Sequence, residues 1–233
     1  MIVYIIMAII AYAIGSISFS VIFTKKFAGF DVREKGSGNA GSTNVLRTAG
    51  KKVAFLTLIC DILKGVVAIL IALLFGAMFT FVNRAILVEI AALAVVIGHT
   101  FPIFFDFKGG KGVATSLGVI LLINWKIGLI CLTFALVLMA ITRMVSLGSI
   151  SAAVLFGVLT IFIRDSYIVE YDASFILFGI LLAAFVIYNH RTNVKRILNG
   201  TENKLSFKKK EENQDKEKSS DEKETEEIKK EEN

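Results

Sequence analysis

The sequence predicts an all-α integral membrane protein, a bundle of about seven transmembrane helices with its N-terminus outside and its C-terminus in the cytoplasm. Hydrophobic residues make up 55% of the 233 residues and proline occurs once, a composition too apolar for a soluble domain of this size. The apolar residues form long runs, and about 20 such residues suffice for one helix to cross a bilayer. The runs are too long and too uniformly apolar for the alternating strands of a membrane β-barrel.

Seven apolar runs are long enough, or nearly long enough, to be transmembrane helices. They cover residues 2–23, 53–78, 85–101, 113–124, 126–142, 147–163 and 173–190. The first run differs from a cleaved signal peptide, because no basic segment precedes it and Lys25 and Lys26 follow it. The run 113–124 is short for a full crossing, and a re-entrant segment here would move the later loops to the other side of the membrane.

Basic residues in the short loops predict the orientation, since cytoplasmic loops are enriched in Lys and Arg. With the N-terminus outside, three basic residues, Arg84, Lys126 and Arg164, fall on the outer side and fourteen on the inner side. The inner set comprises Lys25, Lys26, Arg33, Lys35, Arg47, Lys51, Lys52, Lys108, Lys111, Arg143, Arg191, Lys195, Arg196 and Lys204. This asymmetry predicts that the C-terminus is cytoplasmic.

Residues 208–233 differ from the rest of the chain. They contain eight Lys and eleven Asp or Glu with almost nothing apolar, so we expect a disordered charged cytoplasmic tail after a transmembrane domain at 1–207. Because the whole chain carries +6 and the tail −3, the transmembrane domain carries +9. This charge lies in membrane-proximal loops, where anionic lipids favour it, and no nucleic-acid-binding fold accompanies it.

Polar, glycine-rich sequence is confined to three stretches that the span count places on one side of the membrane. They read REKGSGNAGSTNVLRTAGKK (33–52), GHTFPIFFDFKGGKGVAT (98–115) and YNHRTNVKRILNGTE (188–202). In the second stretch, Lys111 lies among Gly109, Gly110 and Gly112 just before an apolar helix. Such a loop lets backbone amides approach an anion at the positive end of a helix. Because Gly112 stands where Ser or Thr is required, the loop is not a nucleotide-binding P-loop.

The first stretch suits a phosphate-bearing substrate. Ser37, Thr43 and Asn44 supply hydroxyl and amide groups beside several glycines. Arg47 can bind phosphate through two hydrogen bonds at once. A flexible glycine–serine linker is the alternative interpretation of this stretch.

The third stretch places a possible proton carrier at the inner end of the last span. His190, Asn193 and Arg196 follow one another at i,i+3 spacing and share one face if the helix continues. That face would bring an imidazole, an amide and a guanidinium to one place.

Asp61, Lys64, Glu89 and His99 are ionisable residues that lie within the predicted spans. Asp61 and Lys64, at i,i+3, either pair to fix helix packing or line a polar pocket, because isolated charges in a membrane are costly. A structural role is the simpler interpretation of His99. Glu89 requires a partner that the sequence does not identify.

Three sequence strings resemble the motifs of the bacterial acyl-phosphate:glycerol-3-phosphate acyltransferase family, PlsY. They match these motifs in their order and in their positions between the predicted spans. The strings are GSGNAGSTNVLRTAGKK, GHTFPIFFDFKGGKGVAT and NHRTNVKRILNGTE, and the resemblance covers about residues 1–207. It implies a seven-span enzyme of the bacterial cell (inner) membrane that transfers a fatty acyl group from acyl phosphate to glycerol 3-phosphate. The product would be lysophosphatidic acid, formed in the first acylation step of phospholipid synthesis.

The resemblance also implies the site and its partners. Catalytic roles are expected of Ser37, Lys111, His190 and Asn193, and substrate binding of Thr43, Asn44, Arg47, Gly109, Gly110, Gly112, Ser146 and Arg196. Neither a cofactor nor a metal is expected. The expected partners are both substrates and the lipid bilayer, with functional coupling to the enzyme that produces acyl phosphate. Either His190 or the substrate phosphate would take the proton of the glycerol hydroxyl.

Other classes of membrane protein fit less well. A transporter would have inverted repeats and polar residues near the bilayer midplane, whereas most polar residues here lie at one surface. A metal-dependent alcohol phosphotransferase needs clustered aspartates, and Asp31, Asp61 and Asp106 are far apart in the sequence. Acyl-CoA-dependent acyltransferases carry an H-x-x-x-x-D box, but seven positions separate His99 from Asp106.

Overall fold

The computed structural model describes residues 1–163 and 173–205, and residues Met1–Asn203 form one compact unit. Its elements are α1 (Ile2–Gly15), α2 (Phe19–Ala28), η1 (Val32–Glu34), α3 (Ser42–Thr48), α4 (Lys51–Met78), α5 (Arg84–Thr100), η2 (Ile103–Phe105), α6 (Val113–Ile123), α7 (Trp125–Thr142), α8 (Val145–Phe162), α9 (Ala173–Asn189) and α10 (Arg191–Leu198). The predicted tail at 208–233 and its boundary with the transmembrane domain lie outside the described residues.

The described residues contain fewer full-length membrane spans than the seven that the sequence predicts. Five segments are long and apolar enough: Ile2–Ala28, Lys51–Met78, Arg84–Phe105, Trp125–Thr142 and Val145–Phe162. The pair α9 and α10, bent by 61°, makes a sixth if it is one span. With 11 residues, α6 reaches only about half of a 30 Å hydrocarbon core at about 1.5 Å per residue. The all-helical membrane class is confirmed, whereas seven spans and the orientation stay predictions.

Glycines allow close helix contacts, a common basis of packing inside membranes. α1 packs on α5, where a Cβ on Gly15 would overlap the carbonyl oxygen of Val95. α4 packs on α6, where a Cβ on Gly118 would overlap the carbonyl oxygen of Ile62. Further pairs are α4 with α5, α7 with α8, and α8 with α9. These contacts surround an apolar core.

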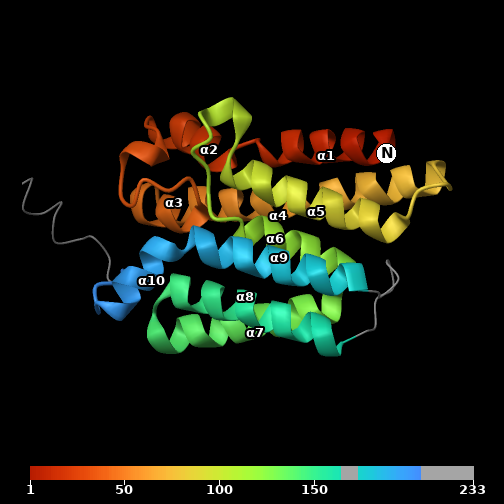
Figure 1. The fold of residues 1–233 in the computed structure, drawn as a ribbon. Helices are drawn as coiled ribbons and strands as arrows, with labels where there is room; N and C mark the ends of the chain where they lie inside the picture. Colours follow the sequence, from red (N-terminus) through yellow and green to blue (C-terminus); the bar gives the residue numbers. More distant parts are fainter. Residues whose placement is uncertain (164–172, 206–233) are drawn as a thin grey trace, which may run out of the picture. The chain divides into compact units, whose positions relative to one another are not determined.

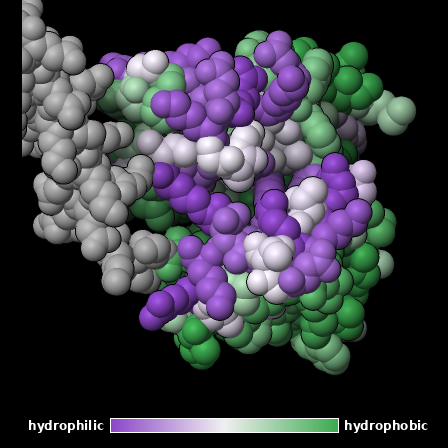
Figure 2. Space-filling view, turned by 90° about the vertical axis from the view of Figure 1, so that its left-hand side faces the viewer, coloured by the Kyte–Doolittle hydropathy of each residue, from purple (hydrophilic) through white to green (hydrophobic). Residues whose placement is uncertain are grey.

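The three polar stretches meet at one end of the bundle (Figure 1). α3 and the loop before it, the loop between α5 and α6, and α10 all lie there, on the left of the view. Figure 2 shows this end face on, with hydrophilic side chains gathered over it and hydrophobic residues on the flanks. Large apolar side chains such as Leu70, Leu136 and Leu177 are exposed, as expected of residues that face lipid.

Candidate functional site

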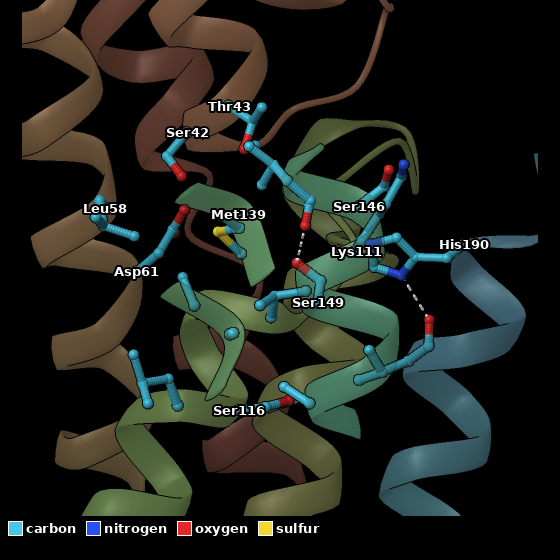
Figure 3. Close-up of a pocket in the computed structure, with 18 of the residues that line it drawn as sticks. Ser42, Thr43, Leu58, Asp61, Lys111, Ser116, Met139, Ser146, Ser149 and His190 are labelled. Carbon is cyan, nitrogen blue, oxygen red and sulfur yellow. Dashed lines mark hydrogen bonds between the residues drawn. The ribbon is translucent and has the colours of Figure 1, made fainter. Parts of the chain in front are cut away.

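A cavity of about 680 Å³ opens among the three polar stretches and continues between the helices. Nine of the twelve predicted site residues line it: Ser37, Thr43, Asn44, Arg47, Lys111, Ser146, His190, Asn193 and Arg196. Gly109, Gly110 and Gly112 are not among the lining residues. In Figure 3, Lys111, Ser146 and His190 stand on one side of the cavity, with Asp61 and Leu58 on the other.

The loop of the first stretch is shaped by Asn44. Its amide nitrogen donates to the carbonyl oxygens of Val32 (3.0 Å) and Lys35 (2.9 Å), while its oxygen accepts from the backbone of Ser37 (2.9 Å). Gly36 has φ +62°, and a Cβ there would overlap the Asn44 side chain. Asn44 therefore fixes the backbone that carries Ser37, and its amide is already occupied with three hydrogen bonds.

This loop is tied to the second polar stretch by Arg33. The guanidinium donates to the carbonyl oxygen of Phe105 at 2.7 Å and pairs with Asp31 at 2.9 Å. The hydrogen bond from Arg33 lowers the pKa of Asp31 to about 2, so the pair is ionised. A backbone hydrogen bond from Ala40 to Gly109, 3.3 Å long, adds a second connection.

The third stretch supplies a buried carboxylate that the sequence analysis missed. Glu202 accepts hydrogen bonds from Ser146 (2.9 Å), Asn193 (2.8 Å) and Arg196 (3.0 Å). Burial opposes ionisation, but these bonds outweigh it and lower the pKa of Glu202. The sequence signal was its place in the quoted string NGTE, although no contact could be assigned from it.

Lys111 connects the glycine loop, residues 109–112, to this network. Its Nζ donates to Asn193 Oδ1, while the amide nitrogen of Asn193 donates to Glu202. Burial, followed by the nearby guanidinium of Arg196, lowers the pKa of Lys111 to about 8. The cation is thus held close to three polar side chains of α10 and the segment after it. They lie at the polar end of the cavity, which we call its mouth.

His190 lies where α9 ends and α10 begins, and its side chain is 3% exposed. Its Nδ1 is 2.8 Å from the carbonyl oxygen of Val186 (Figure 3). Because a carbonyl only accepts, Nδ1 carries the proton, and Nε2 of a neutral ring is an acceptor. As the i,i+3 spacing predicts, His190, Asn193 and Arg196 all line the cavity.

Two of the three glycine amides expected to bind an anion are engaged within the protein, and the substrate-binding role of Gly109, Gly110 and Gly112 stays a prediction. The backbone N–H of Gly109 donates to Thr100 (3.1 Å), and that of Gly110 donates to His99 (3.0 Å). Both amides are therefore used to fold the loop back onto the end of α5. Gly112, with φ +86°, precedes α6 as its N-cap, so its conformation turns the chain into that helix.

The ionisable residues within the spans have partners. Asp61 and Lys64 form an ion pair of 3.0 Å, and Asp61 also lines the cavity. The two residues therefore pair with each other, and one of them also lines the pocket, as the two interpretations from the sequence proposed. Ser174 donates to Glu89 at 2.9 Å. Among the residues that the structure describes, no group of three or more His, Cys, Asp or Glu side chains is arranged to hold a metal ion.

Away from the polar stretches, the cavity wall is apolar and is formed by α4, α6, α7, α8 and α9. It includes Leu117, Ile120, Leu132, Ala135, Leu136, Met139, Ala152, Ala153, Phe156, Leu182 and Ala183. Such a wall can bury a hydrocarbon chain. One cavity thus combines a cationic mouth with an apolar interior.

Comparisons with known proteins agree with this arrangement. The family model described as glycerol-3-phosphate acyltransferase matches residues 5–200. The chain is 47% identical to a glycerol-3-phosphate acyltransferase of Clostridioides difficile (strain 630), covering 88% of this chain and 97% of the relative. It is 43% identical to one of Thermoanaerobacter sp. (strain X514), covering 86% and 95%.

Solved structures give the same result. The crystal structure of PlsY (YgiH), an integral membrane glycerol 3-phosphate acyltransferase, in its glycerol 3-phosphate form is 36% identical, with a TM-score of 0.75 and coverage of 87% of this chain and 96% of that chain. Its lysophosphatidic acid form is 35% identical, with a TM-score of 0.73 and coverage of 87% and 95%. The chain therefore belongs to the glycerol-3-phosphate acyltransferase family, PlsY.

Proposed function

We propose that this protein transfers a fatty acyl group from acyl phosphate to the hydroxyl of glycerol 3-phosphate, giving 1-acylglycerol 3-phosphate. The observation that carries the proposal is a single cavity with cations at its mouth and an apolar interior. Two phosphate-bearing molecules, one with a long hydrocarbon chain, match both parts. The reaction would be the first acylation step of phospholipid synthesis.

The donor chemistry suits the side chains at the mouth. Acyl phosphate is a mixed anhydride, so its phosphate leaves more readily than an alcohol leaves an ester. The protein must therefore mainly hold two anions together and stabilise the charge that develops. Lys111, Arg47 and Arg196 are among the cations that line the cavity, and guanidinium groups bind phosphate with paired hydrogen bonds.

The acceptor hydroxyl loses its proton as the acyl group is transferred. Nε2 of a neutral His190 can accept this proton, since Nδ1 is engaged with Val186. The substrate phosphate is the other candidate base. Ser37 and Asn193 line the same cavity and would orient the two substrates.

Donor choice tests this proposal. Purified protein in detergent is given radiolabelled glycerol 3-phosphate with acyl phosphate, acyl-CoA or acyl-carrier protein in turn, with and without a chelator. We expect product with acyl phosphate alone, at a rate that the chelator leaves unchanged. Turnover with acyl-CoA equal to or faster than that with acyl phosphate would contradict the proposal. The proposed donor also implies functional coupling to the enzyme that produces acyl phosphate.

We further propose that the cavity mouth faces the cytoplasm in the bacterial cell (inner) membrane, on the basis of the basic residues in the loops at that end. A Ser219→Cys variant tests the orientation with a membrane-impermeant thiol reagent. Labelling is expected only after the cells are opened, with the parent protein, which contains Cys60 and Cys131, as the control. Labelling in intact cells would show that the span count is wrong.

A further inference from the structure

Three ionisable side chains of α4 and α5 form a cluster next to the glycine loop and take no part in the chemistry proposed above. Asp61, Lys64 and His99 are 2%, 4% and 6% exposed, and they belong to membrane-spanning segments. Ionisable groups at this depth are costly, and those found there pair with one another or serve a site. We name these three residues the buried triad.

One end of the buried triad holds the break between α1 and α2. Lys64 Nζ is 3.0 Å from Asp61 Oδ1 and donates to the carbonyl oxygens of Gly15 (3.0 Å) and Ile17 (3.1 Å). These contacts use all three donors of the ammonium group. Gly15 ends α1, so the cation also lies at the negative end of a helix, where it is favourable.

The other end of the buried triad meets the glycine loop. His99 Nδ1 is 3.5 Å from Asp61 Oδ1, and the opposite edge of the ring faces Gly110. A Cβ on Gly110 would overlap His99 Nε2 and would lie 2.7 Å from Cε1. The φ of Gly110 is outside the left-handed region. Glycine is therefore required at this position by the imidazole ring and not by the backbone conformation.

Gly110 is followed directly by Lys111, whose ammonium group reaches the cavity mouth. The loop leading to Lys111 is thus held by two backbone hydrogen bonds to α5 and by the His99 ring. We propose that the buried triad positions Lys111: Asp61 orients His99, and the His99 ring sets the place of Gly110 and hence of the phosphate-binding cation. His99 is a positioning residue in this scheme, which rests on the proposed role of Lys111.

A role confined to helix packing makes a different prediction. If the buried triad only stabilised the bundle, its loss would lower thermal stability and leave the affinity of the folded protein for glycerol 3-phosphate unchanged. A positioning role predicts that affinity changes when the fit between His99 and Gly110 changes. Gly109 and Gly110 allow these roles to be separated.

The experiment compares Gly110→Ala and Gly109→Ala, each alone and combined with His99→Ala, in the full chain purified in detergent. Affinity for glycerol 3-phosphate is measured by isothermal titration calorimetry. A Cβ on Gly110 overlaps the His99 side chain, whereas a Cβ on Gly109 overlaps the His99 carbonyl oxygen. Removing the imidazole can therefore relieve the first overlap but not the second, which makes Gly109→Ala the matched control.

We expect Gly110→Ala to weaken binding by about tenfold or more, the size of one misplaced charge-assisted hydrogen bond. His99→Ala should weaken it by about threefold, because the loop loses one support but keeps its backbone bonds. The double variant His99→Ala with Gly110→Ala should return to the level of His99→Ala alone. The double variant His99→Ala with Gly109→Ala should bind glycerol 3-phosphate as weakly as Gly109→Ala alone. If Gly110→Ala does not accumulate in the membrane, the affinity of its double variant, compared with that of His99→Ala alone, is the readout.

The inference would be overturned if the losses of affinity caused by His99→Ala and Gly110→Ala were additive in the double variant. Failure of that double variant to accumulate in the membrane would overturn it as well. So would equal rescue of both glycine variants, or a His99→Ala protein of lower thermal stability with wild-type affinity. Measuring the thermal stability of the variants requires no substrate, and the binding measurement requires no acyl donor. A wild-type protein that failed to use acyl phosphate would therefore reject the proposed function without deciding the role of His99.

Discussion

The mouth and the interior of the cavity are built on different principles. The mouth is held by a few directional contacts, in which Lys111, Asn193, Glu202, Ser146 and Arg196 form one connected network. The interior is lined by apolar side chains from five helices, where shape and volume decide what fits. Loss of one side chain at the mouth should therefore affect rate or phosphate affinity strongly, whereas loss of one in the interior should adjust which chain is accepted.

The largest effect is expected from His190→Ala. Turnover should fall by about 10²-fold or more if Nε2 transfers the proton, with a smaller change in the KM for glycerol 3-phosphate. Steady-state rates with acyl phosphate measure both constants. His190→Gln sharpens the test, because its amide can occupy the place of Nε2 but cannot take up a proton at neutral pH. Recovery of turnover in His190→Gln would show that the residue orients substrate, with the phosphate as the base.

Lys111→Ala should act mainly on binding. Loss of one charge-assisted hydrogen bond to phosphate costs about 1.5–3 kcal/mol, so the KM for glycerol 3-phosphate should rise by about tenfold or more. Turnover at saturation should change less. Lys108→Ala is the matched control, because Lys108 belongs to the same loop but is exposed and does not line the cavity. Equal effects of the two variants would reduce the role of Lys111 to general attraction of anions.

The difference between mouth and interior also decides how much could be predicted from the sequence. The residues of the mouth are recognisable because directional chemistry needs particular side chains, and nine predicted residues line the cavity. The i,i+3 spacing of His190, Asn193 and Arg196 predicted their shared face. The all-helical class followed equally directly from the apolar runs.

Tertiary contacts were less accessible. A glycine before a helix is compatible with an anion cradle, but the amides of Gly109 and Gly110 donate to carbonyl oxygens of α5 that lie nine and eleven positions earlier in the chain. Glu202 could not be placed because its three partners come from α8 and α10. The apolar wall carries no motif, since any side chain of suitable volume meets its requirement.

The pH dependence of binding tests the electrostatics of the mouth. Lys111, with a pKa of about 8, is charged below that pH, and a phosphate ligand favours the charged form. As pH rises through 8 the cation is lost, so the dissociation constant for glycerol 3-phosphate should increase, approaching about tenfold per pH unit. The substrate phosphate, with a second pKa near about 6, is already doubly ionised. Lys111→Arg should bind with constant affinity between pH 7 and about 10, since the guanidinium stays charged.

The smallest effect is expected in the interior, at Phe156. This side chain on α8 is 3% exposed, lines the cavity and meets Phe178 edge to face at 6.2 Å. Beyond it, Ile120, Phe156 and Phe178 among others surround a gap too small to hold a water molecule. Phe156→Ala should open this gap into the cavity and favour longer acyl phosphates. Because each buried CH₂ contributes about 0.8 kcal/mol, the gain should be about fourfold in kcat/KM per methylene accommodated.

A series of acyl phosphates of increasing chain length measures this shift. Phe156→Leu should move the preference less in the same direction, and it guards against loss of folding in the alanine variant, since a buried Phe→Ala change costs about 3–5 kcal/mol. Phe162→Ala is the control, because Phe162 ends the same helix but is 74% exposed. An unchanged preference in both Phe156 variants would place the end of the acyl chain elsewhere along the apolar wall. A fall in rate that is equal for every chain length would instead show that the interior, like the mouth, acts on the chemistry itself.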